Sequence, residues 1–91
     1  MNVVKLLAAA AALSDTPSNV GSSTKVMLQH NHAGGQAHEV TVKNSSGTTL
    51  GSMWVPPHSP LIIDKESTDT VEVASGITDI YATPVAIFGW L

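Results

Sequence analysis

The centre of the chain reads Lys25-Val-Met-Leu-Gln-His30 and, after a Gly-Gly loop, His38-Glu-Val-Thr-Val-Lys43. In both runs apolar and polar residues alternate with a period of two, which is the pattern of a half-buried β-strand. The alternation predicts that Val26, Leu28 and His30 share one face of the first strand. Two such runs on either side of a short glycine-containing loop predict a β-hairpin.

On both sides of this centre, short apolar segments lie between turn residues. Further strands are expected within residues 48–55, 61–64, 70–74 and 77–88, the last interrupted at Pro84. Roughly six to seven short strands predict an all-β fold, either a small antiparallel β-sandwich or a partly open barrel. Because the links are short, consecutive strands are the expected neighbours.

The composition indicates one domain that is built for contact. Residues 1–91 contain no internal repeat, no linker and no cysteine, so disulfides and thiolate zinc sites are excluded. Only 12% of the residues are charged and 43% are hydrophobic, whereas a small domain normally carries about a quarter charged residues. The excess apolar surface predicts burial in a homo-oligomer or a larger assembly. The alternative is an ordinary domain with a surface rich in Ser and Thr.

The charge pattern argues against two classes of partner. The chain has a formal net charge of −3, with four lysines and no arginine. Nucleic-acid-binding proteins need a basic surface, so we expect no nucleic-acid partner. The apolar run after Lys5 is far shorter than the about 20 residues that span a bilayer, and we expect no membrane partner.

Both ends of the chain, residues 1–13 and the tail at residues 85–91, are apolar. Chain ends fray unless something holds them, so both segments are expected in a sheet or against neighbouring subunits. The amino-terminal segment is compatible with a helical turn or a strand, and also with the signal peptide of a secreted protein. The residues expected at a partner interface are Val3, Val4, Leu6, Leu7, Ile87, Phe88, Trp90 and Leu91.

Three histidines are candidate metal ligands. His30 and His32 form a His-x-His pair, which on a strand places both rings on one face about 6.5–7 Å apart. His38 follows the Gly-Gly loop, and three histidines at a hairpin tip can bind zinc or nickel. No nearby aspartate is positioned in the sequence to orient them. We therefore favour the alternative, polar residues at a hairpin tip, and expect neither a metal nor a cofactor.

The sequence offers no catalytic motif. None of the serines lies in a Gly-x-Ser-x-Gly motif, so nucleophilic catalysis is not indicated. The carboxylates at positions 64, 66, 69, 72 and 79 are expected on solvated faces. We expect a protein that is not an enzyme. Trp54 is expected in the core, although an exposed Trp54 or Trp90 would allow sugar stacking.

A shared pattern of strands and turns runs through six segments: Ser18–Val26, a strand ending at Asn31, Val40–Gly47, Gly51–Pro56, Leu61–Asp69 and Ala82–Ala86. These segments resemble the small virion structural proteins of tailed phages, especially marine and cyanobacterial phages. They cover most of residues 14–86 as a pattern of strands and turns. The histidine-bearing segment and the end at 88–91 depart from that pattern, so the resemblance implies no role for them.

The resemblance implies a non-enzymatic structural protein at the capsid surface of a virion. Its expected function is capsid decoration or cementing, with the shell stabilised by multivalent contacts to the major capsid protein or another virion protein. A homo-oligomer is expected, a trimer being one option. Two alternatives stay open: a tail, neck or fibre component, and a small secreted carbohydrate-binding β-module.

Overall fold

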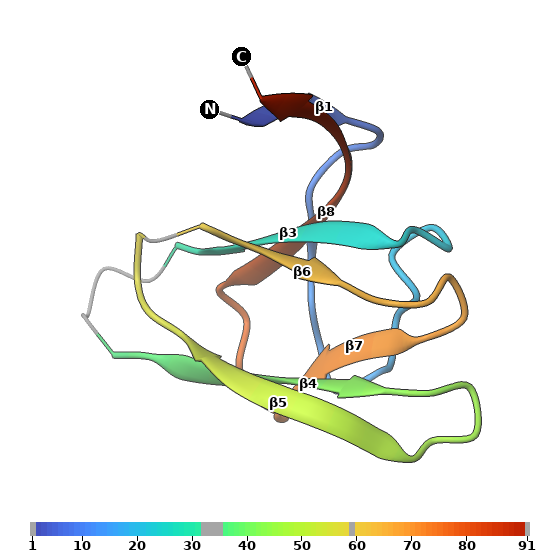
Figure 1. Ribbon diagram of the computed structural model, residues 1–91. Helices are drawn as coiled ribbons and strands as arrows, with labels where there is room; N and C mark the ends of the chain where they lie inside the picture. The colour runs from blue at the N-terminus through green and yellow to red at the C-terminus, as the bar shows by residue number, and fades with distance from the viewer. Residues whose placement is uncertain (1, 32–35, 59, 91) are drawn as a thin grey trace.

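The computed structural model describes the backbone of residues 2–31, 36–58 and 60–90, and the side chains of residues 4–31, 36–58 and 60–87 (Figure 1). These residues form eight strands: β1 (Asn2–Leu6), β2 (Ala11–Ala12), β3 (Lys25–His30), β4 (His38–Lys43), β5 (Thr49–Val55), β6 (Leu61–Asp64), β7 (Thr70–Val73) and β8 (Ile80–Trp90). Across the described ranges there is no helix that is long and apolar enough to cross a membrane.

The strands form two antiparallel sheets that face each other (Figure 1). The five-stranded sheet has the order β1-β8-β3-β6, with β2 also paired to β8, and the three-stranded sheet has the order β5-β4-β7. This arrangement confirms the predicted all-β sandwich. The strand number exceeds the predicted six to seven because the amino-terminal segment contributes β1 and β2 as extended strands, with no helical turn.

The hydrophobic core lies between the two sheets and is built mostly from valine and other aliphatic side chains. Its buried members are Leu13, Val20, Val26, Leu28, Val40, Val55, Val71, Val73, Ile80 and Ala82. As the alternation predicted, Val26, Leu28 and His30 are buried on one face of β3. Each fully buried aliphatic side chain stabilises the fold by about 1.5–3 kcal/mol relative to leaving it exposed.

The predicted hairpin between residues 25–31 and 38–43 is wrong. β3 pairs with β6 and β8, whereas β4 pairs with β5 and β7, so the intervening segment connects one sheet to the other. Both strands turn their apolar faces inward. The two faces meet across the core and are buried together there. A period-two pattern identifies the buried face of a strand but not its hydrogen-bonding partner.

Consecutive strands are neighbours only in part. β4 and β5 form a hairpin through the turn at 44–47, where the Asn44 side-chain oxygen accepts hydrogen bonds from the backbone N–H groups of Ser46 and Thr48. The other pairings join strands distant in sequence. The free edge of β7 is partly covered, because Ser18 exchanges two backbone hydrogen bonds with Val71 and the Ser14 carbonyl accepts one from the Val73 N–H. Covering an edge protects it from pairing with other chains.

Pro84 does not interrupt the last strand as expected. β8 continues through it, but its partners change there: Val26 of β3 pairs with Pro84, and Leu6 of β1 pairs with Val85. The Pro84 carbonyl accepts a hydrogen bond from the Leu7 N–H at 2.9 Å. The donor that proline lacks would face the same edge, so the carbonyl of Leu7 receives no hydrogen bond from Pro84 in return. Proline therefore costs at most one sheet hydrogen bond, at a position between β1 and β2.

Replacing Leu28 by alanine tests the core. The side chain is fully buried, so Leu28→Ala is expected to lower the free energy of unfolding by about 2–5 kcal/mol. Leu50→Ala is the matched control, because Leu50 is 56% exposed and its truncation is expected to change stability by less than about 0.5 kcal/mol. Urea unfolding followed by circular dichroism measures both. Equal effects of the two substitutions would contradict the assigned core.

Candidate functional site

The two chain ends pair with each other in a feature that we call the terminal ribbon, formed by residues 2–7 and 85–90. β1 runs antiparallel to the second half of β8, with Val4 opposite Ile87 and Leu6 opposite Val85. In Figure 1 this ribbon projects from the body of the sandwich and carries both ends of the chain. The expectation that the ends are held in a sheet is therefore met by their mutual pairing.

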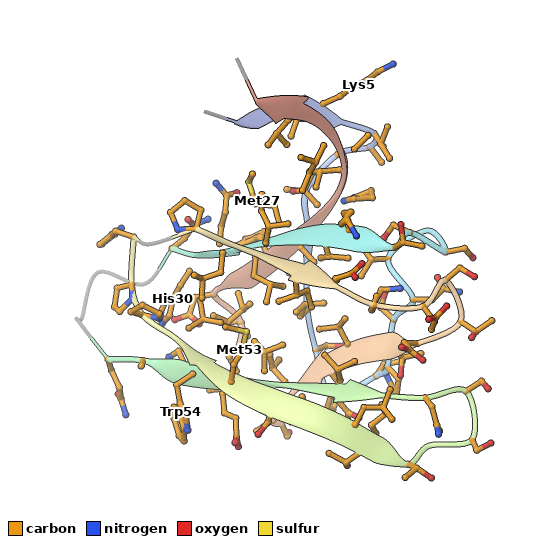
Figure 2. The ribbon with its side chains drawn as sticks, in the orientation of Figure 1. Lys5, Met27, His30, Met53 and Trp54 are labelled. Atoms are coloured by element: carbon orange, nitrogen blue, oxygen red, sulfur yellow. The ribbon has the colours of Figure 1, made fainter. Side chains whose placement is uncertain are left out.

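The terminal ribbon exposes large apolar side chains. Leu6 is 64% exposed and Leu7, which follows it, is 54% exposed. Val4 and Ile87 are half-buried, while Lys5 points away from the ribbon into solvent (Figure 2). Of the other predicted interface residues, the side chains of Val3, Phe88 and Trp90 and the whole of Leu91 lie outside the described part of the chain.

The backbone of the terminal ribbon also has unused hydrogen-bonding capacity. Among residues 2–31, 36–58 and 60–90, no other strand pairs with the outer edge of β1. Beyond Pro84, no strand of these residues pairs with the edge of β8 that faces away from β1. A two-stranded ribbon is only marginally stable in water, and unpaired strand edges can accept a strand from another chain. Exposed leucines and open edges make this ribbon a candidate interface.

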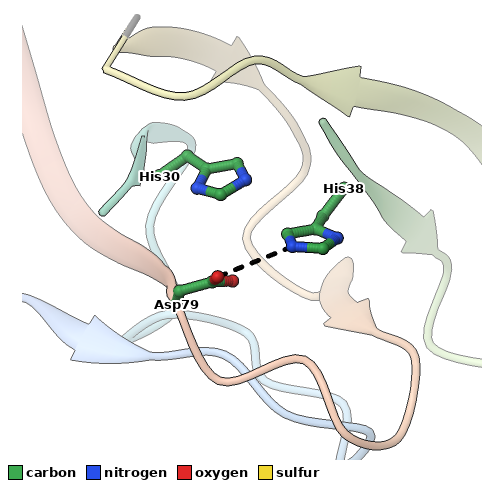
Figure 3. Close-up of side chains that lie close together, drawn as sticks. All are labelled: His30, His38 and Asp79. Carbon is green, nitrogen blue, oxygen red and sulfur yellow. Dashed lines mark ion pairs between the residues drawn. The ribbon is translucent and has the colours of Figure 1, made fainter. Parts of the chain in front are cut away.

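A second feature is the histidine–aspartate cluster, formed by His30, His38 and Asp79 (Figure 3). His30 is the last residue of β3, His38 is the first residue of β4, and Asp79 immediately precedes β8. The two imidazole rings are stacked with their centroids 4.8 Å apart and an interplanar angle of 19°. The His38 Nε2 atom lies 3.5 Å from the Asp79 Oδ2 atom.

Burial and hydrogen bonding fix the ring of His30. This residue is only 1% exposed, and its Nε2 atom lies 2.8 Å from the backbone carbonyl oxygen of Gln36. A carbonyl oxygen only accepts, so Nε2 carries the hydrogen in this contact. In the neutral ring Nδ1 then has the lone pair. The three residues can each offer one ligand atom, and these atoms all lie within 4.8 Å of one another.

The sequence predicted part of this cluster. His30 and His38 do lie together, but across the two sheets instead of across a hairpin tip, and His32 lies outside the described residues. Asp79 was missed, because it was expected on a solvated face with no aspartate near the histidines. The antiparallel register that places His30 opposite Ile80 brings Asp79 to the end of β3. Only a prediction of that pairing would have found it.

Trp54 is not a core residue, contrary to expectation. It is 63% exposed and projects from the outer face of the three-stranded sheet, whereas Met53 points between the sheets (Figure 2). The alternation of β5 explains this, because Val55 occupies the core and its neighbour Trp54 must face outward. Trp54 stands opposite Glu39 in the sheet.

A shallow groove of about 450 Å³ runs beside Trp54, and its lining includes Glu39, Lys43 and Glu72. The Lys43 ammonium lies 2.7 Å from a carboxylate oxygen of Glu72, and the Ser52 hydroxyl donates to Glu39 at 3.0 Å. The polar neighbours of Trp54 therefore come from adjacent strands. Along the chain its neighbours are mainly apolar, which is why the sequence did not indicate a polar groove here.

Lys65 is a buried cation with a structural explanation. It is 7% exposed, and its ammonium donates to the backbone carbonyls of Ser23 at 2.7 Å and Glu66 at 3.2 Å. Burial lowers the pKa of Lys65, and the nearby Asp69 carboxylate opposes this shift. The ammonium holds the turn after β6 against the segment before β3, so we assign it to the fold and not to a site.

No protein-family model, curated protein or solved structure matches this chain.

Proposed function

We propose that this chain is a non-enzymatic structural protein of a virion, and that capsid decoration or cementing is its function. The terminal ribbon is the observation that carries the proposal. It presents Leu6 and Leu7 to solvent on a two-stranded projection with open edges. The low fraction of charged residues and the resemblance of residues 14–86 to small phage virion proteins support the same function.

The mechanism is docking of the terminal ribbon on a neighbouring subunit. Burying each exposed leucine contributes about 1.5–3 kcal/mol, and a strand of the partner can pair with an open edge of the ribbon. A single contact of this size is weak. On a symmetric shell, a homo-oligomer engages several identical sites at once, and the combined avidity exceeds the affinity of one contact.

The partner that we propose is the major capsid protein or another virion protein, with the sandwich body facing outward from the capsid surface. A trimer about a local symmetry axis would place three ribbons against the shell together. A tail, neck or fibre component would use the same contact. The position of the protein in the particle distinguishes these locations.

The first test replaces the exposed leucines of the ribbon. Leu6→Ser with Leu7→Ser removes two apolar contacts, and the expected result is at least about hundredfold weaker attachment per copy. The matched control is Leu50→Ser with Ile62→Ser, which changes two exposed aliphatic residues on the sandwich body, 56% and 39% exposed. Attachment is measured by co-sedimentation of each variant with virus particles that are produced from the genome encoding this protein. Full attachment of the ribbon variant, or equal loss in both variants, would contradict the proposal.

The second test shortens the chain by removing residues 87–91. The deletion removes part of the β1–β8 pairing but leaves Ile80–Pro84, which pair with β3. We therefore expect a folded sandwich that no longer joins particles. Circular dichroism and urea unfolding check the fold, and the protein content of purified particles checks incorporation. Unchanged incorporation of the shortened chain would refute the role of the ribbon.

A second candidate function, sugar binding, is favoured by the exposed Trp54 and the groove beside it. An aromatic face stacks on the apolar face of a sugar ring, while polar groups such as Glu39, Lys43 and Glu72 can bind its hydroxyls. In this case the chain is a small carbohydrate-binding β-module, as a secreted protein or as part of a particle.

A glycan array tests the sugar-binding function. Trp54→Ala is expected to lower the signal of any bound glycan at least about tenfold, because stacking on the ring is lost, while Trp54→Phe retains part of it. The side chain is 63% exposed, so neither substitution is expected to disturb the fold. Absence of glycan binding by the unmodified protein, or binding unchanged in Trp54→Ala, would exclude this candidate.

A further inference from the structure

We propose that the histidine–aspartate cluster binds a divalent transition-metal ion, with zinc as the occupant, through His30, His38 and Asp79. The cluster shares no residue with the terminal ribbon, so this inference does not depend on the proposed virion function. Two imidazole nitrogens and one carboxylate oxygen are a donor set that zinc uses with a fourth position left for water or another ligand.

His30 has the environment of a metal-binding histidine. Ligand histidines usually donate their other ring N–H to a carbonyl or carboxylate, which fixes the orientation of the ring. The contact of His30 Nε2 with the Gln36 carbonyl at 2.8 Å provides this arrangement. The ring is held by burial in the core, so its Nδ1 atom is the proposed ligand and the fixed point of the site.

His38 and Asp79 can complete the site by small rotations of their side chains. The ligand atoms lie within 4.8 Å of one another, whereas ligands around tetrahedral zinc are separated by about 3.3 Å, given zinc–nitrogen bonds of about 2.0–2.1 Å. The required convergence is therefore at most about 1.5 Å. The side chains of His38 and Asp79 are 15% and 21% exposed, which leaves them more room to move than His30.

Asp79 supplies the carboxylate that a bound cation would need. A cation near buried groups requires such a compensating charge. The His38–Asp79 contact at 3.5 Å already brings a nitrogen toward a carboxylate oxygen. Zinc would replace the stacking of the two rings by coordination of both.

The position of the cluster gives the metal a structural role. β3 belongs to the five-stranded sheet and β4 to the three-stranded sheet, and Asp79 ends the connection between β7 and β8. A metal bound by all three would join the two sheets at one end of the sandwich. Small domains often need a disulfide or a metal for stability, and this chain has no cysteine.

Zinc titration of chelator-treated protein tests the site. We expect one zinc ion per chain by calorimetry, and a rise in Tm of about 10 °C when free zinc exceeds the Kd about a hundredfold. Cobalt(II) is a second probe, because tetrahedral coordination gives an intense visible absorption band. The absence of stoichiometric binding of both ions at micromolar concentrations would overturn the proposal.

Variants identify the ligands. Asp79→Asn and His38→Gln keep the approximate size of each side chain but weaken it as a ligand, and each is expected to raise the zinc Kd at least about tenfold. His58→Asn is the matched control, because His58 is an exposed histidine outside the cluster and should leave the Kd unchanged. Each variant is compared with its own metal-free state, so a change in stability alone does not mimic the result. Zinc binding of unchanged strength in both cluster variants would overturn the assignment.

Discussion

β8 divides its hydrogen bonds at Pro84, and both the core and the terminal ribbon depend on that division. Before Pro84 the strand is central, with β3 on one side and β2 on the other. After Pro84 it leaves the body and pairs with β1. A proline inside a central strand normally removes a ladder hydrogen bond. Here the missing donor falls where one partner strand has ended and the next has not begun, so one strand serves both the core and the terminal ribbon.

A consequence of this topology is that the two histidines and the aspartate of the histidine–aspartate cluster lie together at one end of the sandwich. β3 and β4 face each other across the core, and the connection from β7 enters β8 beside the end of β3. His30, His38 and Asp79 therefore meet, although they belong to three different segments. The groove beside Trp54 reaches the same end of the sandwich, because His38 is part of its lining.

The sequence predicted local features well and long-range features poorly. The alternation of β3 correctly gave its buried face, because side chains alternate along any strand whatever its neighbours are. The same pattern does not specify partners, so the expected β3–β4 hairpin was wrong. Trp54 was misplaced because its size suggested the core, while the position of Val55 in the same strand requires Trp54 to face outward.

In the candidate site, too, the sequence predicted contacts between residues close in the chain but not contacts between distant ones. His30 and His38 were recognisable as a pair because only a short loop separates them, whereas Asp79 joins them solely through the register of β3 and β8. The terminal ribbon was foreseen as two separate apolar ends. Their pairing with each other required knowledge that β8 extends past the body of the sandwich, which a proline in the strand argued against.

The pairing of Asn2 with Trp90 has a practical consequence for engineering this chain. Any peptide joined before residue 2 or after residue 90 emerges at the same place, the outer end of the terminal ribbon, and an affinity tag at either end would crowd the ribbon. The turn at residues 44–47 lies away from the ribbon, at the far end of the β4–β5 hairpin (Figure 1). Foreign peptides are therefore better inserted there.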